Sequence, residues 1–241
     1  MLLYQLHRVQ GIGKGNGKEQ ERFKHHFNPN ANYGIIRSEH LGRWDGAVGA
    51  WAVEAFNKYG TLYQIKYGEH DISNASPQDA RKWAAQGLPK ELLEAAGDHK
   101  VIASALVKTP DEVKAALQNG YGVILCSGVG YNSTRDSLGY LRPETVWQHC
   151  MACIAWRNKA SGREGYLISN SWGGPEGTWV NGPIWPEDMV FGSFWITPEN
   201  LQLHLKENDS YAIAGYEGFK RRPLKWDEIF KIGEEINVED N

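Results

Sequence analysis

Two apolar segments in the second half of the chain carry side chains that could take part in hydrolysis. The first begins at His149, and the second ends at Asn170 in the sequence Asn170-Ser-Trp-Gly. A polar stretch over residues 157–164 separates them, so we expect a hairpin that sets the Asn170 amide beside the His149 ring, with Trp172 covering both. Nucleophilic catalysis needs this pair, because the imidazole takes the proton of the nucleophile and a third group orients the imidazole.

These segments resemble the papain-like cysteine peptidases, in which the catalytic histidine begins one strand and the orienting asparagine ends the next. The resemblance implies that His149 is the base, that Asn170 orients it, and that Trp172 and Ser171 line the cleft. It also implies an α+β fold of two lobes, an N-terminal helical lobe packed on a C-terminal antiparallel β-barrel-like lobe. Gly192-Ser-Phe-Trp and Asp209-Ser-Tyr-Ala are similar to bacterial and phage-encoded members.

The resemblance places the nucleophilic cysteine upstream, at the start of a helix whose N-terminus would lower the pKa of a thiol. The matching segment, residues 40–56, contains no cysteine, serine or threonine. One placement sets Ala47 at the cysteine and Leu41 at the glutamine that helps to bind the oxyanion. The other sets Ala50 at the cysteine and Trp44 at the glutamine. We favour Ala47, because Val48-Gly49 then follows it as in bacterial and phage relatives.

Either placement leaves a methyl group at the nucleophile and an apolar side chain at the oxyanion donor. An alanine cannot attack a carbonyl, and losing one oxyanion donor costs about 10²–10³ in rate. An engineered Cys-to-Ala change would explain the first loss but not the second. We therefore predict a catalytically inactive protein with a binding or structural role, whose cleft is filled by Leu41, Trp44 and their neighbours or holds a peptide uncut. The alternative is an active cysteine peptidase seen as a Cys-to-Ala variant.

The three cysteines do not offer a substitute nucleophile. Cys126 lies in an apolar run that is typical of a buried strand, and Cys150 and Cys153 follow His149 on its strand. Side chains alternate along a strand, so Cys150 points away from the face of His149. We predict that all three are free, buried apolar residues rather than a disulfide framework, which indicates a reducing compartment.

Composition narrows the choice of partners and compartment. The 241-residue chain has a formal net charge of −3 and 41% hydrophobic residues, with no charge excess for nucleic acid or an anionic membrane. It has no apolar run of transmembrane length, and its first residues do not form a signal peptide. We expect protein partners or copies of the same chain, as in a phage particle or other assembly, in the cytoplasm or a virion. We predict no cofactor and no metal, because His25 and His26 lack a spaced third ligand.

The elements that must position the site follow from caps, turns and apolar runs. We assign residues 1–36 to an extended arm, 37–108 to the helical lobe, 109–218 to the β lobe and 219–241 to a charged tail. Capping residues predict helices that begin after Ser76 and Thr109. The other predicted elements are a helix over 47–59, strands over 121–127, 192–197 and 209–214, a cleft loop over 128–139 and a helix over 198–205.

Overall fold

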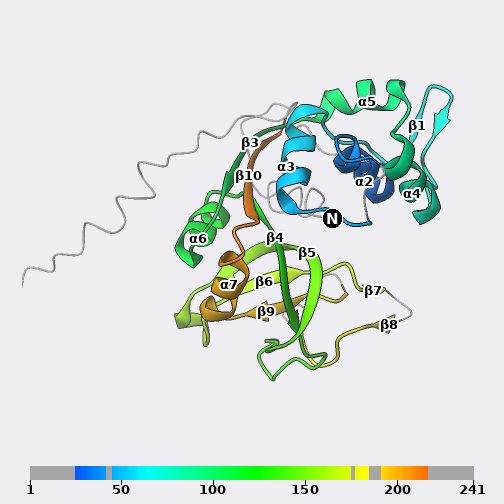
Figure 1. The fold of residues 1–241 in the computed structure, drawn as a ribbon. Coiled ribbons are helices and arrows are strands. Elements are labelled where there is room, and N and C mark those ends of the chain that lie inside the picture. The colour runs from blue at the N-terminus through cyan, green and yellow to red at the C-terminus, as the bar shows by residue number, and fades with distance from the viewer. Residues whose placement is uncertain (1–24, 42–44, 175–176, 185–190, 217–241) are drawn as a thin grey trace, which may run out of the picture.

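The structure, a computed structural model, describes residues 25–41, 45–174, 177–184 and 191–216. Helices gather in one lobe and most strands in the other, as Figure 1 shows, and strands β3 and β10 run between them. The predicted residues 1–24 of the arm and the predicted tail from 219 lie outside the described ranges. None of the described helices has the length and apolar character that a membrane span requires.

The helical lobe contains helices α2 (Pro29–Arg37), α3 (Gly49–Lys58), α4 (Pro77–Gln86) and α5 (Lys90–Ala96), the turn η1 (Gly97–His99), and the hairpin of β1 (Lys66–Tyr67) with β2 (His70–Asp71). Apolar side chains from these elements form one core cluster, including Ile35, Leu62, Ile72 and Leu92. Gly60, with φ +93°, follows α3 as predicted, because this left-handed conformation favours glycine.

Helix α2 corrects the prediction that residues up to 36 are extended. The side chain of Asn28 accepts hydrogen bonds from the backbone N–H groups of Asn30 (3.0 Å) and Ala31 (2.9 Å), and Pro29 occupies the first helical position. Asparagine before proline is a start signal for a helix. The polar character of residues 19–32 hid this signal in the sequence.

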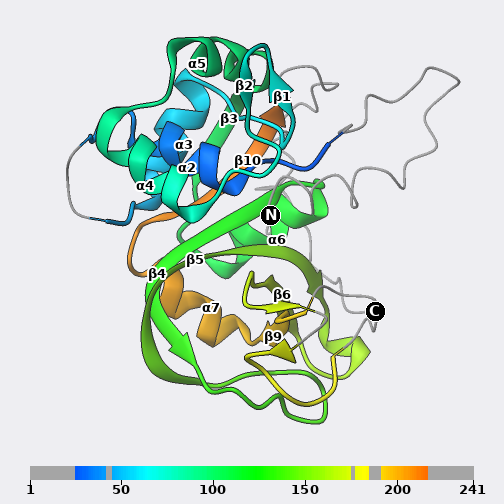
Figure 2. The same cartoon turned by 90° about the vertical axis from the view of Figure 1, so that its right-hand side faces the viewer.

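The β lobe is built on one antiparallel sheet of six strands in the order β3-β10-β4-β5-β6-β9. The strands are β3 (Val101–Leu106), β4 (Gly122–Tyr131), β5 (Pro143–Arg157), β6 (Gly165–Ser169), β9 (Phe194–Ile196) and β10 (Ser210–Tyr216). Strands β4 and β5 are long and curve together around α7 (Pro198–Leu205), as Figure 2 shows. The described sheet has β3 and β9 at its edges, so the strands do not close into a barrel.

Helix α6 (Pro110–Gln118), the turn η2 (Lys159–Ser161), and the short pair β7 (Gly173–Gly174) and β8 (Gly177–Thr178) complete the lobe. The predicted Ser76 cap of α4 and the predicted Thr109–Glu112 capping box of α6 are confirmed, and Asp79 completes a second capping box with Ser76. The predicted helix over 198–205 is confirmed as α7.

The predicted cleft loop over residues 128–139 begins too early. Residues 128–131 continue strand β4, and Val129 and Gly130 pair with Val146 and Thr145 of β5. Gly130 is needed there because a Cβ would collide with the side chains of Thr145 and Trp147. A glycine that suggests a loop in the sequence instead lets two strands approach closely.

Candidate active site

The pairing of β5 with β6 brings His149 and Asn170 together. Ala152 pairs with Ser169, the last residue of β6, so Asn170 emerges beside the ring of His149. The Nε2 atom of His149 lies 2.9 Å from Oδ1 of Asn170, and Asn170 is 1% exposed. Since Oδ1 is an acceptor, Nε2 carries the hydrogen and Nδ1 is left as the basic nitrogen of the neutral ring.

Trp172 covers this pair. Its ring stacks on the His149 ring with centroids 4.4 Å apart and planes 20° apart. Trp147 and Trp179 pack edge-on against the Trp172 ring, with ring centroids 4.8 and 5.9 Å from its centroid. This aromatic cluster limits how far the imidazole can rotate. Trp172 is 39% exposed and Ser171 is also exposed, so both are reachable from solvent.

The other side of the candidate site is the start of α3, which carries no nucleophile. The helix begins at Gly49 after Val48, so Ala50 lies in its first turn, and Ala47 lies two residues before it in an exposed segment. Neither Ala47 nor Ala50 has a side chain that can attack or donate. Trp44, the second candidate for the oxyanion position, lies outside the described residues.

Leu41, the favoured position of the oxyanion glutamine, lies beside the end of α4. It is 44% exposed, and its methyl groups lie next to Gly87 at the end of α4, where Cδ1 is 3.7 Å from the position of a Cβ. That Leu41 and its neighbours fill the former cleft stays a prediction. The apolar character of Leu41 is accounted for by packing near α4.

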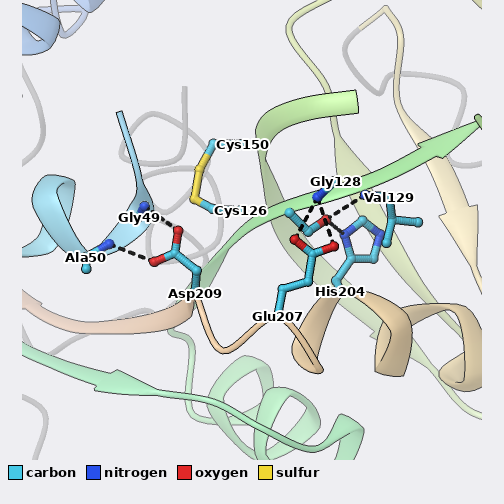
Figure 3. Close-up of a disulfide and its surroundings, with 10 residues drawn as sticks. Gly49, Ala50, Cys126, Gly128, Val129, Cys150, His204, Glu207 and Asp209 are labelled. Atoms are coloured by element: carbon cyan, nitrogen blue, oxygen red, sulfur yellow. Dashed lines mark hydrogen bonds between the residues drawn. A yellow bond between two sulfur atoms is a disulfide. The ribbon is translucent and has the colours of Figure 1, made fainter. Parts of the chain in front are cut away.

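A carboxylate that sequence reasoning missed occupies the start of α3. Asp209 accepts hydrogen bonds from the N–H groups of Gly49 (2.6 Å) and Ala50 (2.8 Å), as Figure 3 shows. Val48 makes no side-chain cap, so Asp209 supplies the cap from 160 residues away in the sequence. The negative charge also suits the positive end of the helix dipole. Only tertiary structure brings a cap over such a separation.

The same short connection between α7 and β10 carries a second carboxylate. Glu207 accepts from the N–H of Gly128, with Oε1 at 3.0 Å and Oε2 at 2.9 Å. Asn208 stands between the two acids with φ +55° and is the one non-glycine residue with positive φ in the described ranges. One tight turn therefore ties β4 through Glu207 and the helical lobe through Asp209 (Figure 3).

Two adjacent residue pairs of strands β4 and β5 connect His149 with the start of α3. Ser127 pairs with His149, and the next rung pairs Cys126 with Cys150. A Cβ at Gly49 would lie 3.0 Å from Sγ of Cys126, so the start of α3 contacts the rung beside the one that holds His149. Side chains alternate along a strand. The side chains of the Cys126–Cys150 pair therefore face α3, and those of the Ser127–His149 pair face the opposite side of the sheet.

Cys126 and Cys150 form a disulfide, which corrects the prediction that all three cysteines are free. Their Cα atoms are 4.1 Å apart, because the two residues are direct partners across antiparallel strands. Register cannot be derived from cysteine spacing alone, and that is why the pairing was missed. Cys153 is free and fully buried, as predicted, and burial raises the pKa of its thiol.

A second histidine, also missed from the sequence, lies buried on α7. His204 bonds through Nδ1 to Oγ of Ser127 and through Nε2 to the hydroxyl of Tyr131, both at 2.6 Å. Burial lowers the pKa of His204 to about 4, so its ring is neutral at pH 7. Its position in the core and its two hydroxyl partners indicate a structural role in joining α7 to β4.

The site therefore contains an oriented base, His149, but no nucleophile at the start of α3 for it to act on. In the described part of the chain, Nδ1 of His149 makes no hydrogen bond, and the N–H groups at the start of α3 are bonded to Asp209. Within the same ranges, no group of three or more His, Cys, Asp or Glu side chains has the geometry to hold a metal ion.

Comparison with known proteins shows the fold. No protein-family model matches the chain, and no relative is found among curated proteins. Among solved structures, the chain is similar to Xylellain, a cysteine protease from Xylella fastidiosa, with a TM-score of 0.52 and 16% identity over 88% of this chain and 76% of that one. At this identity the likeness concerns architecture alone. The chain has an α+β fold of papain-like, two-lobed architecture.

Proposed function

We propose that this chain is a catalytically inactive papain-like protein that binds a peptide or protein partner, or serves as a component of an assembly. The observation that carries the proposal is the Asp209 carboxylate on the N–H groups of Gly49 and Ala50. A peptidase needs donors at this place to stabilise the negative oxygen that develops on the substrate. A carboxylate there occupies the donors and repels a second negative charge.

The Asp209 contacts bear directly on the placement of the missing nucleophile at Ala50. With Ala50 at that position, its own N–H is the donor that Asp209 occupies. With Ala47, the attacking atom would belong to an exposed segment that precedes the helix. In each case the natural gene supplies a direct check, because a cysteine codon at 47 or 50 would overturn the proposal.

A second candidate, an active cysteine peptidase seen as a Cys-to-Ala variant, is favoured by one observation. The His149–Asn170 pair keeps a bond of 2.9 Å under Trp172, which is the arrangement that a thiol nucleophile needs. A base that is ready to act would be expected to restore reactivity when a thiol is returned to the helix start.

The experiment that separates the two candidates introduces Ala47→Cys and Ala50→Cys, each alone and each with His149→Ala. Labelling by a peptidyl electrophile and hydrolysis of a mixed peptide library are then measured. An inactive protein gives slow labelling that His149→Ala leaves unchanged, and no hydrolysis. Labelling that is fast and falls at least about tenfold with His149→Ala would establish the peptidase reading instead.

Adding Asp209→Asn to each cysteine variant tests whether the Asp209 carboxylate blocks the N–H donors of Gly49 and Ala50. If the carboxylate is what closes the donor site, its neutralisation increases the labelling rate of the Ala50→Cys variant. An unchanged rate, with a folded protein by circular dichroism, would show that Asp209 does not oppose catalysis.

A further inference from the structure

The two residues of the Cys126–Cys150 disulfide differ in their exposure to solvent. Cys126 is 5% exposed, whereas Cys150 is exposed on the strand that carries His149. The pair lies beside the start of α3, with Asp209 next to it, as Figure 3 shows. A thiolate attacks a disulfide at one sulfur while the other leaves, so unequal access selects the sulfur that is attacked.

The surroundings of Cys126 explain its protection. Sγ of Cys126 lies 3.0 Å from the position of a Cβ at Gly49, and Oδ1 of Asp209 lies 2.9 Å from the same point. The helix start therefore contacts this sulfur, and the Asp209 carboxylate lies near the same residue of the helix. An incoming thiolate at Cys126 would meet the backbone of α3, whereas Cys150 is an exposed residue.

We propose that this disulfide is a thiol-exchange site at which a small-molecule thiol modifies Cys150. The thiolate of the small molecule forms a new S–S bond to Sγ of Cys150, the Cys126–Cys150 bond breaks, and Cys126 leaves as a thiolate that takes a proton from water. This step transfers one disulfide bond without net oxidation. A second thiolate then attacks the mixed disulfide, so that the two cysteines are reduced and the small thiol is oxidised to its own disulfide.

The site lies at the junction between the lobes. Cys150 follows His149 and faces the side of the sheet that contacts α3. A group attached to Cys150 therefore stands next to the helix start, on the opposite face of the sheet from the His149–Trp172 stack. The inference does not depend on whether the protein is a peptidase, because it uses only the disulfide and its neighbours.

Mass spectrometry of the oxidised full-length protein tests the proposal. The protein is treated with limiting glutathione under native conditions, quenched with iodoacetamide and digested. We expect the glutathione adduct on Cys150 and the alkyl group on Cys126, with at least about tenfold preference over the reverse pattern. Cys153, which is fully buried, stays unmodified and reports that the fold is intact. Equal adducts, a preference for Cys126, or no adduct on the folded protein would overturn the proposal.

A matched pair of variants tests the role of the neighbouring charge. Asp209→Asn removes a negative charge near the helix start that opposes the departure of Cys126 as a thiolate, so exchange speeds by about 3- to 10-fold. Glu207→Gln removes a carboxylate from the same turn that is bonded to Gly128 instead, and exchange stays within about twofold of the unchanged protein. Equal acceleration in both variants, or none in Asp209→Asn, would contradict this account of the leaving group. Adduct mapping on the unchanged protein needs neither variant to fold.

Discussion

The two sides of the candidate site satisfy their polar groups in different ways. On the β-lobe side, His149 is bonded to Asn170 at 2.9 Å and stacked under Trp172, so its ring is oriented while Nδ1 remains free within the described residues. On the helical side, the donors at the start of α3 are already bonded to Asp209. On the β-lobe side, the basic Nδ1 atom of His149 has no hydrogen-bond partner among the described residues. On the helical side, the first two N–H groups of α3 both bond Asp209.

The His149–Asn170 hairpin can therefore keep its structure without a nucleophile at the start of α3. The hairpin that holds His149 and Asn170 is stabilised by its own pairing and by the aromatic cluster, so it does not require a nucleophile opposite. The helix start requires a cap whether or not it catalyses, and Asp209 supplies one.

Acid should weaken the β-lobe side first. Burial holds the pKa of His204 at about 4, against 6.5 for a free histidine, so the unfolded chain takes up the proton before the folded one. The resulting stability is complete above pH 6.5 and is lost as the pH falls toward 4, by about 3 kcal/mol in the free energy of unfolding. Urea titrations at pH 7, 5.5 and 4 measure it. His204→Gln, which does not titrate, should show a smaller loss, and identical losses in the two proteins would refute the assignment.

Gly49→Ala should damage the helical side. The new Cβ would lie 2.7 Å from the carbonyl oxygen of Asp209 and 3.0 Å from Sγ of Cys126, so the cap or the disulfide must shift. We expect a loss of about 2 kcal/mol in the free energy of unfolding. Gly97→Ala is the matched control, because its Cβ would meet only Cε of Lys100 at 3.9 Å. A loss of equal size in the control would show that crowding at position 49 is not the cause.

Asp209→Ala should cost less, about 1.5 kcal/mol, because water can reach the released N–H groups once the side chain is gone. Amide hydrogen exchange at Gly49 and Ala50 should accelerate in the same variant. Glu207→Ala serves for comparison, since the Glu207 carboxylate bonds the N–H of Gly128 on β4 and not the start of α3. If exchange at Gly49 and Ala50 rose as much in Glu207→Ala, the turn as a whole would be acting rather than the Asp209 cap.

Trp172→Ala should have the smallest effect on stability, about 1 kcal/mol, because the ring is 39% exposed and its contact with His149 is a single stack. The ring protons of His149 should shift in the NMR spectrum as the stacked indole is removed. Trp172→Phe retains an aromatic face and should shift them less. Unmoved His149 signals in Trp172→Ala would mean that the stack does not exist in solution.

Local sequence signals predicted much of the fold. Serine or threonine followed by proline and an acid marked the starts of α4 and α6, since each side chain bonds a backbone N–H only three residues away. The hairpin that joins His149 to Asn170 was also expected, because both strands and the polar turn between them are adjacent in the chain. Helix α2 was missed although Asn28 and Pro29 are a local signal of the same kind.

Other features that the sequence did not reveal are contacts that join distant segments. The disulfide depends on the register of β4 against β5, which a shift of one residue would abolish. The hydroxyl partners of His204 come from a strand more than 70 residues before it. The choice between Ala47 and Ala50 stays a prediction, although the structure sets Ala50 inside α3 and Ala47 before it.

The sequence alone showed the lack of a nucleophile over residues 40–56, and its resemblance to papain-like cysteine peptidases implied the two-lobed α+β class and the His149–Asn170–Trp172 group. Tertiary structure alone decided that Asp209 caps α3 and that Cys126 bonds Cys150. A backbone N–H or a thiol can bond any suitable group that folding brings close enough. Residue types alone do not predict which distant groups will lie within that distance.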